Sequence, residues 1–141
     1  MSKKMLLSIR GQQNYMGQEP DVIELVTEGI LTKLDNGWKL EYDETELTGL
    51  LGVTTTFLIQ PDEVTLKRTG KLNSQMVFRE GVRHDSLYQM EFGALMLTVC
   101  ATHIHWELSE EGGTIDLVYG IEIEQNAAGE ITYHLEIRPI Q

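Results

Sequence analysis

The fold is decided by the stretch Val53-Thr-Thr-Thr-Phe-Leu-Ile-Gln-Pro-Asp-Glu-Val-Thr-Leu-Lys-Arg68. Apolar and polar side chains alternate on both sides of Pro61-Asp62, which is the period-2 pattern of half-buried strands. Proline followed by aspartate suits the corner of a type I turn, because proline pre-sets φ and aspartate bonds the nearby backbone. The stretch therefore predicts a β-hairpin with a four-residue loop, Gln60–Glu63.

The length of this loop fixes which residues face each other across the hairpin. In the predicted register both apolar sets lie on one face of the sheet, and one arginine lies on that face with them. The facing pairs are Ile59 with Val64, Phe57 with Leu66, and Thr55 with Arg68. The register therefore predicts a guanidinium group that points toward the core.

The rest of the chain continues the strand pattern, and no segment has a convincing helical period. We predict a loop at Gln12–Asp21, and Arg83–Phe92 is either a strand or a segment that crosses an end of a barrel. Further strands are predicted at Lys4–Gly11, Val22–Leu34, Ser74–Glu80, Ala94–Leu108, Thr114–Glu124 and Ile131–Ile137.

The turn Asp35-Asn36-Gly37 predicts a second hairpin. A three-residue loop with Gly37 in the left-handed conformation matches apolar residues across the two strands, whereas a two-residue Asn-Gly loop does not. The expected pairs are Leu34 with Trp38, Thr32 with Leu40, and Ile30 with Tyr42. Gly29, inside the first of these strands, predicts a bulge or a sharp bend at a barrel corner.

Antiparallel strands with one apolar face each can form a sandwich or a barrel. We predict one domain, residues 1–141, because a chain of this length buries a core without staples. Sequential hairpins need no crossover, and closure removes the sheet edges. The prediction is therefore an all-β, closed, antiparallel up-and-down barrel of about eight to ten strands.

Several short motifs extend this prediction. They are Glu46-Leu-Thr-Gly49, Gly52-Val-Thr-Thr-Thr56, Val64-Thr-Leu-Lys-Arg-Thr-Gly70, Met76-Val-Phe78 with Gly81, and Tyr88 followed by Phe92-Gly-Ala-Leu95. In this order they resemble the YwiB-like family of small bacterial proteins, over nearly the whole chain. The resemblance implies a lipocalin-like (calycin-type) β-barrel. It implies no activity and supplies no catalytic residues, because the motifs are structural in character.

The charge of the chain argues against some partners. There are 22 acidic and 11 basic residues, for a formal net charge of -11. A field of this sign repels phosphate backbones and anionic lipids, so we expect neither a nucleic-acid nor a membrane partner. The single cysteine, Cys100, cannot form an internal disulfide, and Met5-Leu6-Leu7 is too short for a signal sequence. We therefore expect a cytoplasmic protein.

Arg68 is the first candidate for function, because a buried guanidinium needs a partner and cannot shed its proton. As a functional residue it would be the counter-ion of a ligand carboxylate inside the barrel. As a structural residue it would pair with Glu28, Glu46 or Glu80, or extend toward the barrel mouth. The predicted ligand-binding residues are Arg68, Thr55, Phe57, Leu66, Met76 and Phe78.

His103 and His105 form the second candidate, because both lie on one face of a strand and two histidines can bind a transition metal. However, pairing Trp106 with Leu117 and Ile104 with Tyr119 turns both histidines outward. We therefore predict no metal ligand, no cofactor and no catalytic residue.

The strand Ala94–Leu108 is apolar on both faces for much of its length. One face would line the core, and the other could pack on Arg83–Phe92 or on a second subunit, as in a homodimer. Its second apolar face carries either Leu95, Leu97 and Val99, or Met96, Cys100 and Ile104.

Three hypotheses of function follow. In the first, the barrel binds a small, mostly apolar or anionic ligand through Arg68. In the second, a filled barrel acts as a structural or regulatory interaction module through its outer surface. The third hypothesis is an enzyme that uses a metal at His103 and His105 or a bound cofactor.

Overall fold

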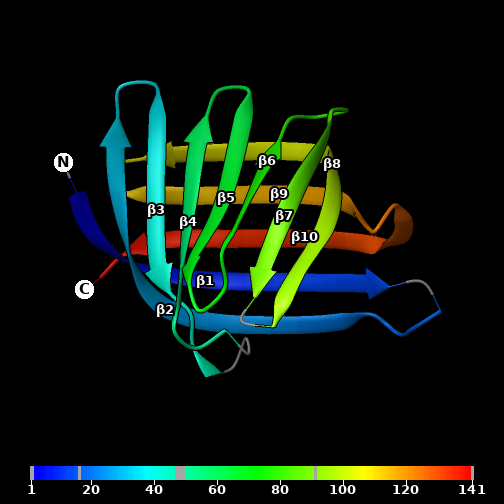
Figure 1. Ribbon diagram of the computed structural model, residues 1–141. Coiled ribbons are helices and arrows are strands. Elements are labelled where there is room, and N and C mark those ends of the chain that lie inside the picture. The colour runs from blue at the N-terminus through cyan, green and yellow to red at the C-terminus, as the bar shows by residue number, and fades with distance from the viewer. Residues whose placement is uncertain (1, 16, 47–49, 91, 141) are drawn as a thin grey trace.

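A computed structural model describes residues 2–15, 17–46, 50–90 and 92–140 of the chain (Figure 1). Within these residues the regular structure consists of ten strands. They are β1 (Ser2–Tyr15), β2 (Asp21–Leu34), β3 (Gly37–Asp43), β4 (Val53–Gln60), β5 (Glu63–Gly70), β6 (Ser74–Phe78), β7 (Arg83–Met90), β8 (Gly93–Ser109), β9 (Gly112–Ile123) and β10 (Asn126–Pro139).

The ten strands form one antiparallel sheet that curls into a nearly closed barrel, in the order β6-β5-β4-β3-β2-β1-β10-β9-β8-β7. The first and last strands pair with each other, from Met5 with Pro139 onward. The two ends of the sheet are β6 and β7, and a bridge joins Asn73, the residue before β6, to Gln89 on β7. Figure 1 shows β9, β10 and β1 crossing behind β3 to β7. The predicted up-and-down barrel is therefore confirmed.

The central hairpin, β4 and β5, has the predicted register. Ile59 pairs with Val64, Phe57 with Leu66, and Thr55 with Arg68. The apolar members of these pairs are buried in the core. Pairing also includes Gln60 and Glu63, so that only Pro61 and Asp62 remain in the turn.

The predicted register of the β2–β3 hairpin is wrong. Leu34 pairs with Gly37 and Leu31 with Leu40, so the turn has two residues, Asp35 and Asn36. Leu31 therefore packs in the core, where it is 3% exposed. Gly37 is needed for a close approach of strands, because a Cβ atom there would lie 1.8 Å from the carbonyl oxygen of Ile59.

At Gly29 the pairing of β2 continues on both sides without a register shift, so the predicted bulge is absent. Strand β2 instead curves from one layer of the barrel into the other (Figure 1). A Cβ atom on Gly29 would lie 2.7 Å from Leu7 Cδ1 and 2.8 Å from Glu41 O. The glycine therefore permits close packing at the curve.

Two segments extend the sheet beyond the prediction. The predicted loop Gln12–Asp21 is wrong in its first part, because β1 continues to Tyr15 and pairs with β10, Gln12 with Thr132 and Tyr15 with Gly129. The ambiguous segment Arg83–Phe92 is largely a strand, since β7 pairs with β8 along its whole length. These extensions place further inward side chains at one end of the barrel.

Strand β8 contains a bulge that explains its two apolar faces. The pairing with β9 shifts between Ala101 and His103, and the strand bends sharply along its length (Figure 1). Before the bulge, the core-facing residues are Leu97, Val99 and Ala101. After the bulge, Ile104, Trp106 and Leu108 pack against the core. Most of the apparent second face is thus the same face displaced by one residue.

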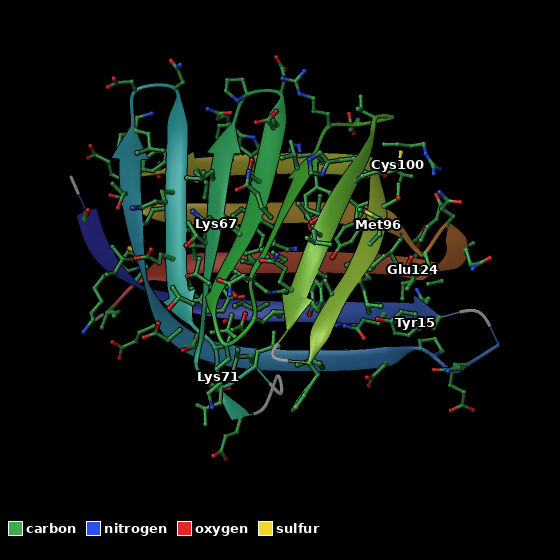
Figure 2. The ribbon with its side chains drawn as sticks, in the orientation of Figure 1. Tyr15, Lys67, Lys71, Met96, Cys100 and Glu124 are labelled. Carbon is green, nitrogen blue, oxygen red and sulfur yellow. The ribbon has the colours of Figure 1, made fainter. Side chains whose placement is uncertain are left out.

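The outer side of β8 retains two sulfur-containing residues, Met96 and Cys100 (Figure 2). Met96 is 40% exposed, and Cys100 is partly buried. Of the other residues in the two predicted sets, Leu97 and Val99 are buried, Ile104 packs against the core, and Leu95 lines the cavity described below. In the described part of the chain, no helix has the length and apolar character to cross a membrane.

Candidate functional site: a tyrosine-lined cavity around Arg68

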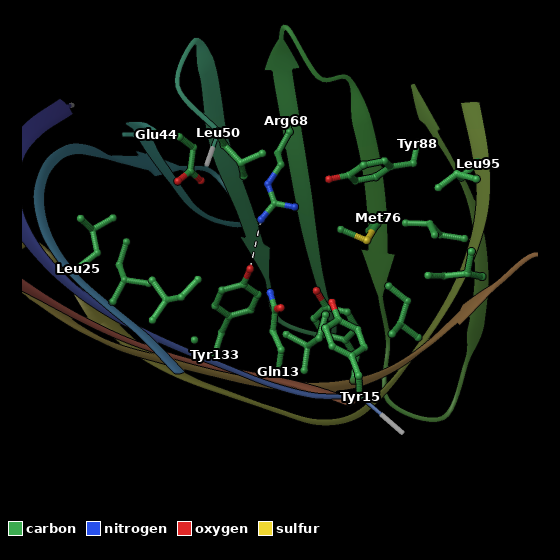
Figure 3. Close-up of a pocket in the computed structure, with 18 of the residues that line it drawn as sticks. Gln13, Tyr15, Leu25, Glu44, Leu50, Arg68, Met76, Tyr88, Leu95 and Tyr133 are labelled. Atoms are coloured by element: carbon green, nitrogen blue, oxygen red, sulfur yellow. Dashed lines mark hydrogen bonds between the residues drawn. The ribbon is translucent and has the colours of Figure 1, made fainter. Parts of the chain in front are cut away.

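The barrel contains a partly open cavity of about 320 Å³. Its lining comes from strands on both layers and also includes Glu44 and Leu50, which follow β3 and precede β4. Leucine and isoleucine make up about half of the lining residues, and polar side chains converge among them (Figure 3). A concave apolar site with a few polar groups is the usual form of a small-molecule pocket.

All five tyrosines of the chain line this cavity, and they come from five different strands. They are Tyr15 on β1, Tyr42 on β3, Tyr88 on β7, Tyr119 on β9 and Tyr133 on β10. None of the three phenylalanines and two tryptophans, all within the described residues, belongs to the lining. The aromatic residues of the cavity lining are therefore all tyrosines, which carry a hydroxyl group.

Arg68 projects from β5 into the middle of this group (Figure 3). Its Nη2 donates a hydrogen bond of 3.2 Å to the hydroxyl of Tyr133. Its Nε is buried and has no hydrogen-bond partner in the described part of the chain. No carboxylate among the described residues lies within ion-pair distance of the guanidinium.

The environment keeps Arg68 charged. Burial disfavours the guanidinium and is the largest influence on its pKa. Tyr133 and Tyr119 act in the opposite direction, and the pKa of Arg68 is raised overall. The cavity therefore holds a permanent positive charge that is hydrogen-bonded to a neutral hydroxyl.

The three carboxylates predicted as internal partners of Arg68 lie elsewhere. Glu28 forms an ion pair with Lys4 at 3.4 Å, and Glu80 Oε2 accepts a hydrogen bond of 3.1 Å from the backbone nitrogen of Ile104. Glu46 is exposed. Arg68 therefore forms no ion pair with any of these three residues.

An acidic residue that the sequence did not suggest, Glu44, also lines the cavity and is only 5% exposed. Its Oε2 accepts a hydrogen bond from Thr55 Oγ1. Burial raises the pKa of Tyr42, and Glu44, which is hydrogen-bonded to Tyr42, raises it further. Among the described residues, the lining thus contains one cation, Arg68, and one acidic side chain, Glu44.

The structure brings two of the six predicted ligand-binding residues, Arg68 and Met76, to the cavity surface. Thr55 and Leu66 are fully buried without lining it. Phe57 and Phe78 support the wall from behind. The ring of Phe57 meets that of Tyr133 edge-on at 6.5 Å, and the ring of Phe78 lies 4.5 Å from that of Tyr119.

The tyrosines are the functional candidates that sequence reasoning missed. A signal existed for three of them, because Tyr42, Tyr119 and Tyr133 continue the alternating apolar sets of their strands. Tyr15 falls in the segment predicted as a loop, and Tyr88 in the segment that remained ambiguous. The five side chains meet only because strands distant in the sequence pair in a particular register. Local sequence patterns do not reveal that register.

His103 and His105 lie on the outside, as predicted, with ring centroids 6.5 Å apart. The predicted pairing is displaced by two residues, because Trp106 pairs with Ile115 and Ile104 with Leu117. A shift of two residues preserves the face. Within the described ranges, no three His, Cys, Asp or Glu side chains cluster as metal ligands would.

Comparison with known proteins agrees with the fold. A family model described as a domain of unknown function, DUF1934, matches residues 7–137. The chain is 30% identical over 103 residues to the uncharacterized beta-barrel protein YwiB of Bacillus subtilis (strain 168), which covers 73% of this chain and 71% of YwiB.

The crystal structure of the YwiB protein from Bacillus subtilis is also similar, with a TM-score of 0.81 and 25% identity. The match covers 96% of this chain and 92% of that one. The resemblance inferred from the sequence motifs is confirmed, although residues 47–49 of the first motif lie outside the described residues. The chain therefore belongs to the DUF1934 family and has the β-barrel fold of YwiB.

Proposed function

We propose that this protein binds a small amphipathic anion inside its barrel, with Arg68 as the counter-ion. The observation that carries the proposal is the state of Arg68. Among the residues that the structure describes, its Nε is buried without a partner, and its Nη2 is bonded to the hydroxyl of Tyr133. A buried charge is normally compensated, because desolvation costs several kcal/mol per ion. A ligand oxyanion would supply the missing partner.

The rest of the cavity suits an apolar body. Leu95 and Leu97 on β8 and Ile121 on β9 form one aliphatic wall, and β1, β2 and β10 contribute Ile9, Leu25 and Ile131 on another. A volume of about 320 Å³ is at the small end of the range of known ligand sites. A hollow interior favours this proposal over a filled barrel that acts through its outer surface.

By analogy, small up-and-down barrels such as lipocalins hold one ligand in their interior, and we propose the same lipocalin-like arrangement here. A location in the cytoplasm is part of the proposal, because an unpaired cysteine is typical of a reducing compartment. An enzyme based on His103 and His105 has less support, since both histidines lie on the outer face without a clustered third ligand in the described residues.

The first test compares the native and denatured masses of untagged protein, because a non-covalent excess would reveal a bound molecule. The second measures the affinities of decanoate and decanol by calorimetry. The two probes share one tail and differ in charge. We expect decanoate to bind at least about tenfold more tightly than decanol, a difference of ~1.4 kcal/mol.

The variant Arg68→Met should abolish this difference between the two probes. Arg10→Met is the matched control, because it removes the same charge from an exposed pair with Glu24 on the outside of the barrel. The proposal fails if the native mass shows no adduct and the wild-type protein binds neither probe. It also fails if Arg68→Met binds both probes as the wild type does.

A further inference from the structure

Two tyrosines on neighbouring strands line the cavity together with Arg68. Tyr119 and Tyr133 project inward from the neighbouring strands β9 and β10. Their rings are nearly parallel, with an angle of 26° between their planes and centroids 6.5 Å apart. Because both side chains leave the same face of the sheet, both hydroxyl groups extend into the barrel.

The hydroxyl of Tyr133 has a free hydrogen. A phenol group accepts through its oxygen and donates through its O–H. The oxygen of Tyr133 accepts the hydrogen bond from Arg68 Nη2. Its O–H is therefore available to donate to a further acceptor beside the guanidinium.

Tyr119 is the more informative residue, because it is only 2% exposed and yet lines the cavity. Its hydroxyl has no hydrogen-bond partner among the described residues. The hydroxyl oxygen is not one of the fully buried atoms that lack a partner, so it has open surface toward the cavity. Phe78, which packs against the Tyr119 ring, occupies a neighbouring position without a hydroxyl group.

The hydroxyl of Tyr119 is held in its neutral, donating form. Burial raises the pKa of Tyr119 well above its usual value, and Tyr133 raises it further, while Arg68 lowers it. Arg68 and Tyr119 both line the same cavity.

We infer that the hydroxyls of Tyr119 and Tyr133 are specificity-determining donors that, together with Arg68, recognise the oxygen atoms of a carboxylate on an apolar body. This inference rests on the proposed function and adds the class of ligand. The guanidinium provides charge and two-point geometry. The hydroxyls provide two uncharged donors, so the site distinguishes a carboxylate from an alcohol by more than charge.

The test uses Tyr119→Phe and Tyr133→Phe with the probes decanoate and decanol. Each substitution removes one oxygen atom and keeps the ring. We expect each variant to bind decanoate about 3- to 30-fold more weakly, while the affinity for decanol stays within about twofold. Decanol reports any change in the apolar cavity, so it is the internal control for each variant.

Thermal unfolding shows whether each variant folds. The two hydroxyls are tested in separate variants, so if one variant does not fold, the decanoate-to-decanol ratio of the other still tests the inference. The inference is overturned if both folded variants keep the decanoate-to-decanol ratio of the wild type while Arg68→Met loses it. In that result the proposed function survives. Wild-type protein that binds neither probe overturns both.

Discussion

Arg68 on β5 and Tyr133 on β10 are 65 residues apart in the sequence, and a hydrogen bond of 3.2 Å joins them across the barrel. In the sheet, four strands separate the two that carry them, β4, β3, β2 and β1. The bond therefore forms only when the sheet has curled. It brings the buried charge to the middle of a cavity instead of leaving it at the wall.

The stability of Arg68→Met tests whether this arginine is retained for function. Replacing a buried charge by an apolar side chain of similar length removes a desolvation cost. We expect the free energy of unfolding to stay equal or to rise by about 1–4 kcal/mol. Urea denaturation gives this value, with Arg10→Met as the exposed control, for which a change of at most about 1 kcal/mol is expected. A marked loss of stability in Arg68→Met would indicate a structural role.

Gly37→Ala tests the register of the β2–β3 hairpin. The new Cβ would lie 1.8 Å from the carbonyl oxygen of Ile59, so the backbones of β3 and β4 must separate. We expect a loss of about 1–3 kcal/mol or more in urea denaturation. Gly120→Ala is the control, because the nearest atom to its Cβ is Gly129 O at 4.0 Å. Equal stability of the two variants would contradict the observed register.

The sequence predicts the fold well where the pattern is local. The β4–β5 register follows from the alternation on both sides of Pro61-Asp62. The β2–β3 register does not, because Leu34, Thr32 and Ile30 look as suitable for the core as Leu31. The choice is made by the close contact of Gly37 with β4, a third strand that the pattern of the hairpin does not contain.

Of the residues that line the cavity, the sequence predicted Arg68 and Met76 as ligand-binding, but none of the tyrosines. Arg68 follows from the register of one hairpin, so its inward direction could be derived. The tyrosines come from five strands, and their convergence depends on β1 reaching Tyr15 and on β7 being a strand. The sequence of β8 has apolar residues on both faces, and the bulge explains them. The same pattern is equally typical of a strand at a subunit interface, so it does not predict the bulge.

Deleting Thr102 tests that bulge. The pairing of β8 with β9 shifts between Ala101 and His103, so Thr102 is the extra residue. Without it, Trp106 and its core-facing neighbours would turn to solvent or the strand would slip. We expect a loss of at least about 3 kcal/mol, the cost of removing one tryptophan from a core. Thr102→Ala keeps the residue count and should change stability by no more than about 0.5 kcal/mol in the same urea titration. Similar losses for both would rule out the bulge as the cause.

Alkaline pH should destabilise the protein through its buried tyrosines. Burial raises the pKa values of Tyr15, Tyr42 and Tyr119 above the ordinary 10.0. Above that value the unfolded chain loses protons that the folded chain keeps, so the free energy of unfolding falls as pH rises. Each group contributes up to about 1.4 kcal/mol per pH unit.

Urea denaturation from about pH 8 to about pH 11 measures this slope. The stabilisation by the neutral tyrosines is fully present below pH 10.0, the ordinary value, and declines above it. Tyr119→Phe should show a shallower decline by the contribution of one group. An unchanged slope in this variant would mean that Tyr119 ionises normally in the folded protein.

Glu44 should set the charge of the preferred ligand. It lines the same cavity as Arg68, and its Oε2 accepts a hydrogen bond from Thr55. One acidic side chain and one guanidinium in the same cavity favour a ligand with a single negative charge, because a second negative charge would be repelled by Glu44 in a site of low polarity. We therefore expect the wild-type protein to prefer decanoate to the dianion of decyl phosphate.

Glu44→Gln keeps an acceptor for Thr55 and removes the charge. We expect this variant to bind decyl phosphate about tenfold or more tightly than the wild type does, and decanoate with a smaller gain. Calorimetry on both probes gives the two ratios, and Glu24→Gln, on the outside of the barrel, controls for net charge. If Glu44→Gln raises the two affinities by the same factor, Glu44 acts only through the overall field. In that case the size of the head group, and not its charge, would decide which anions enter.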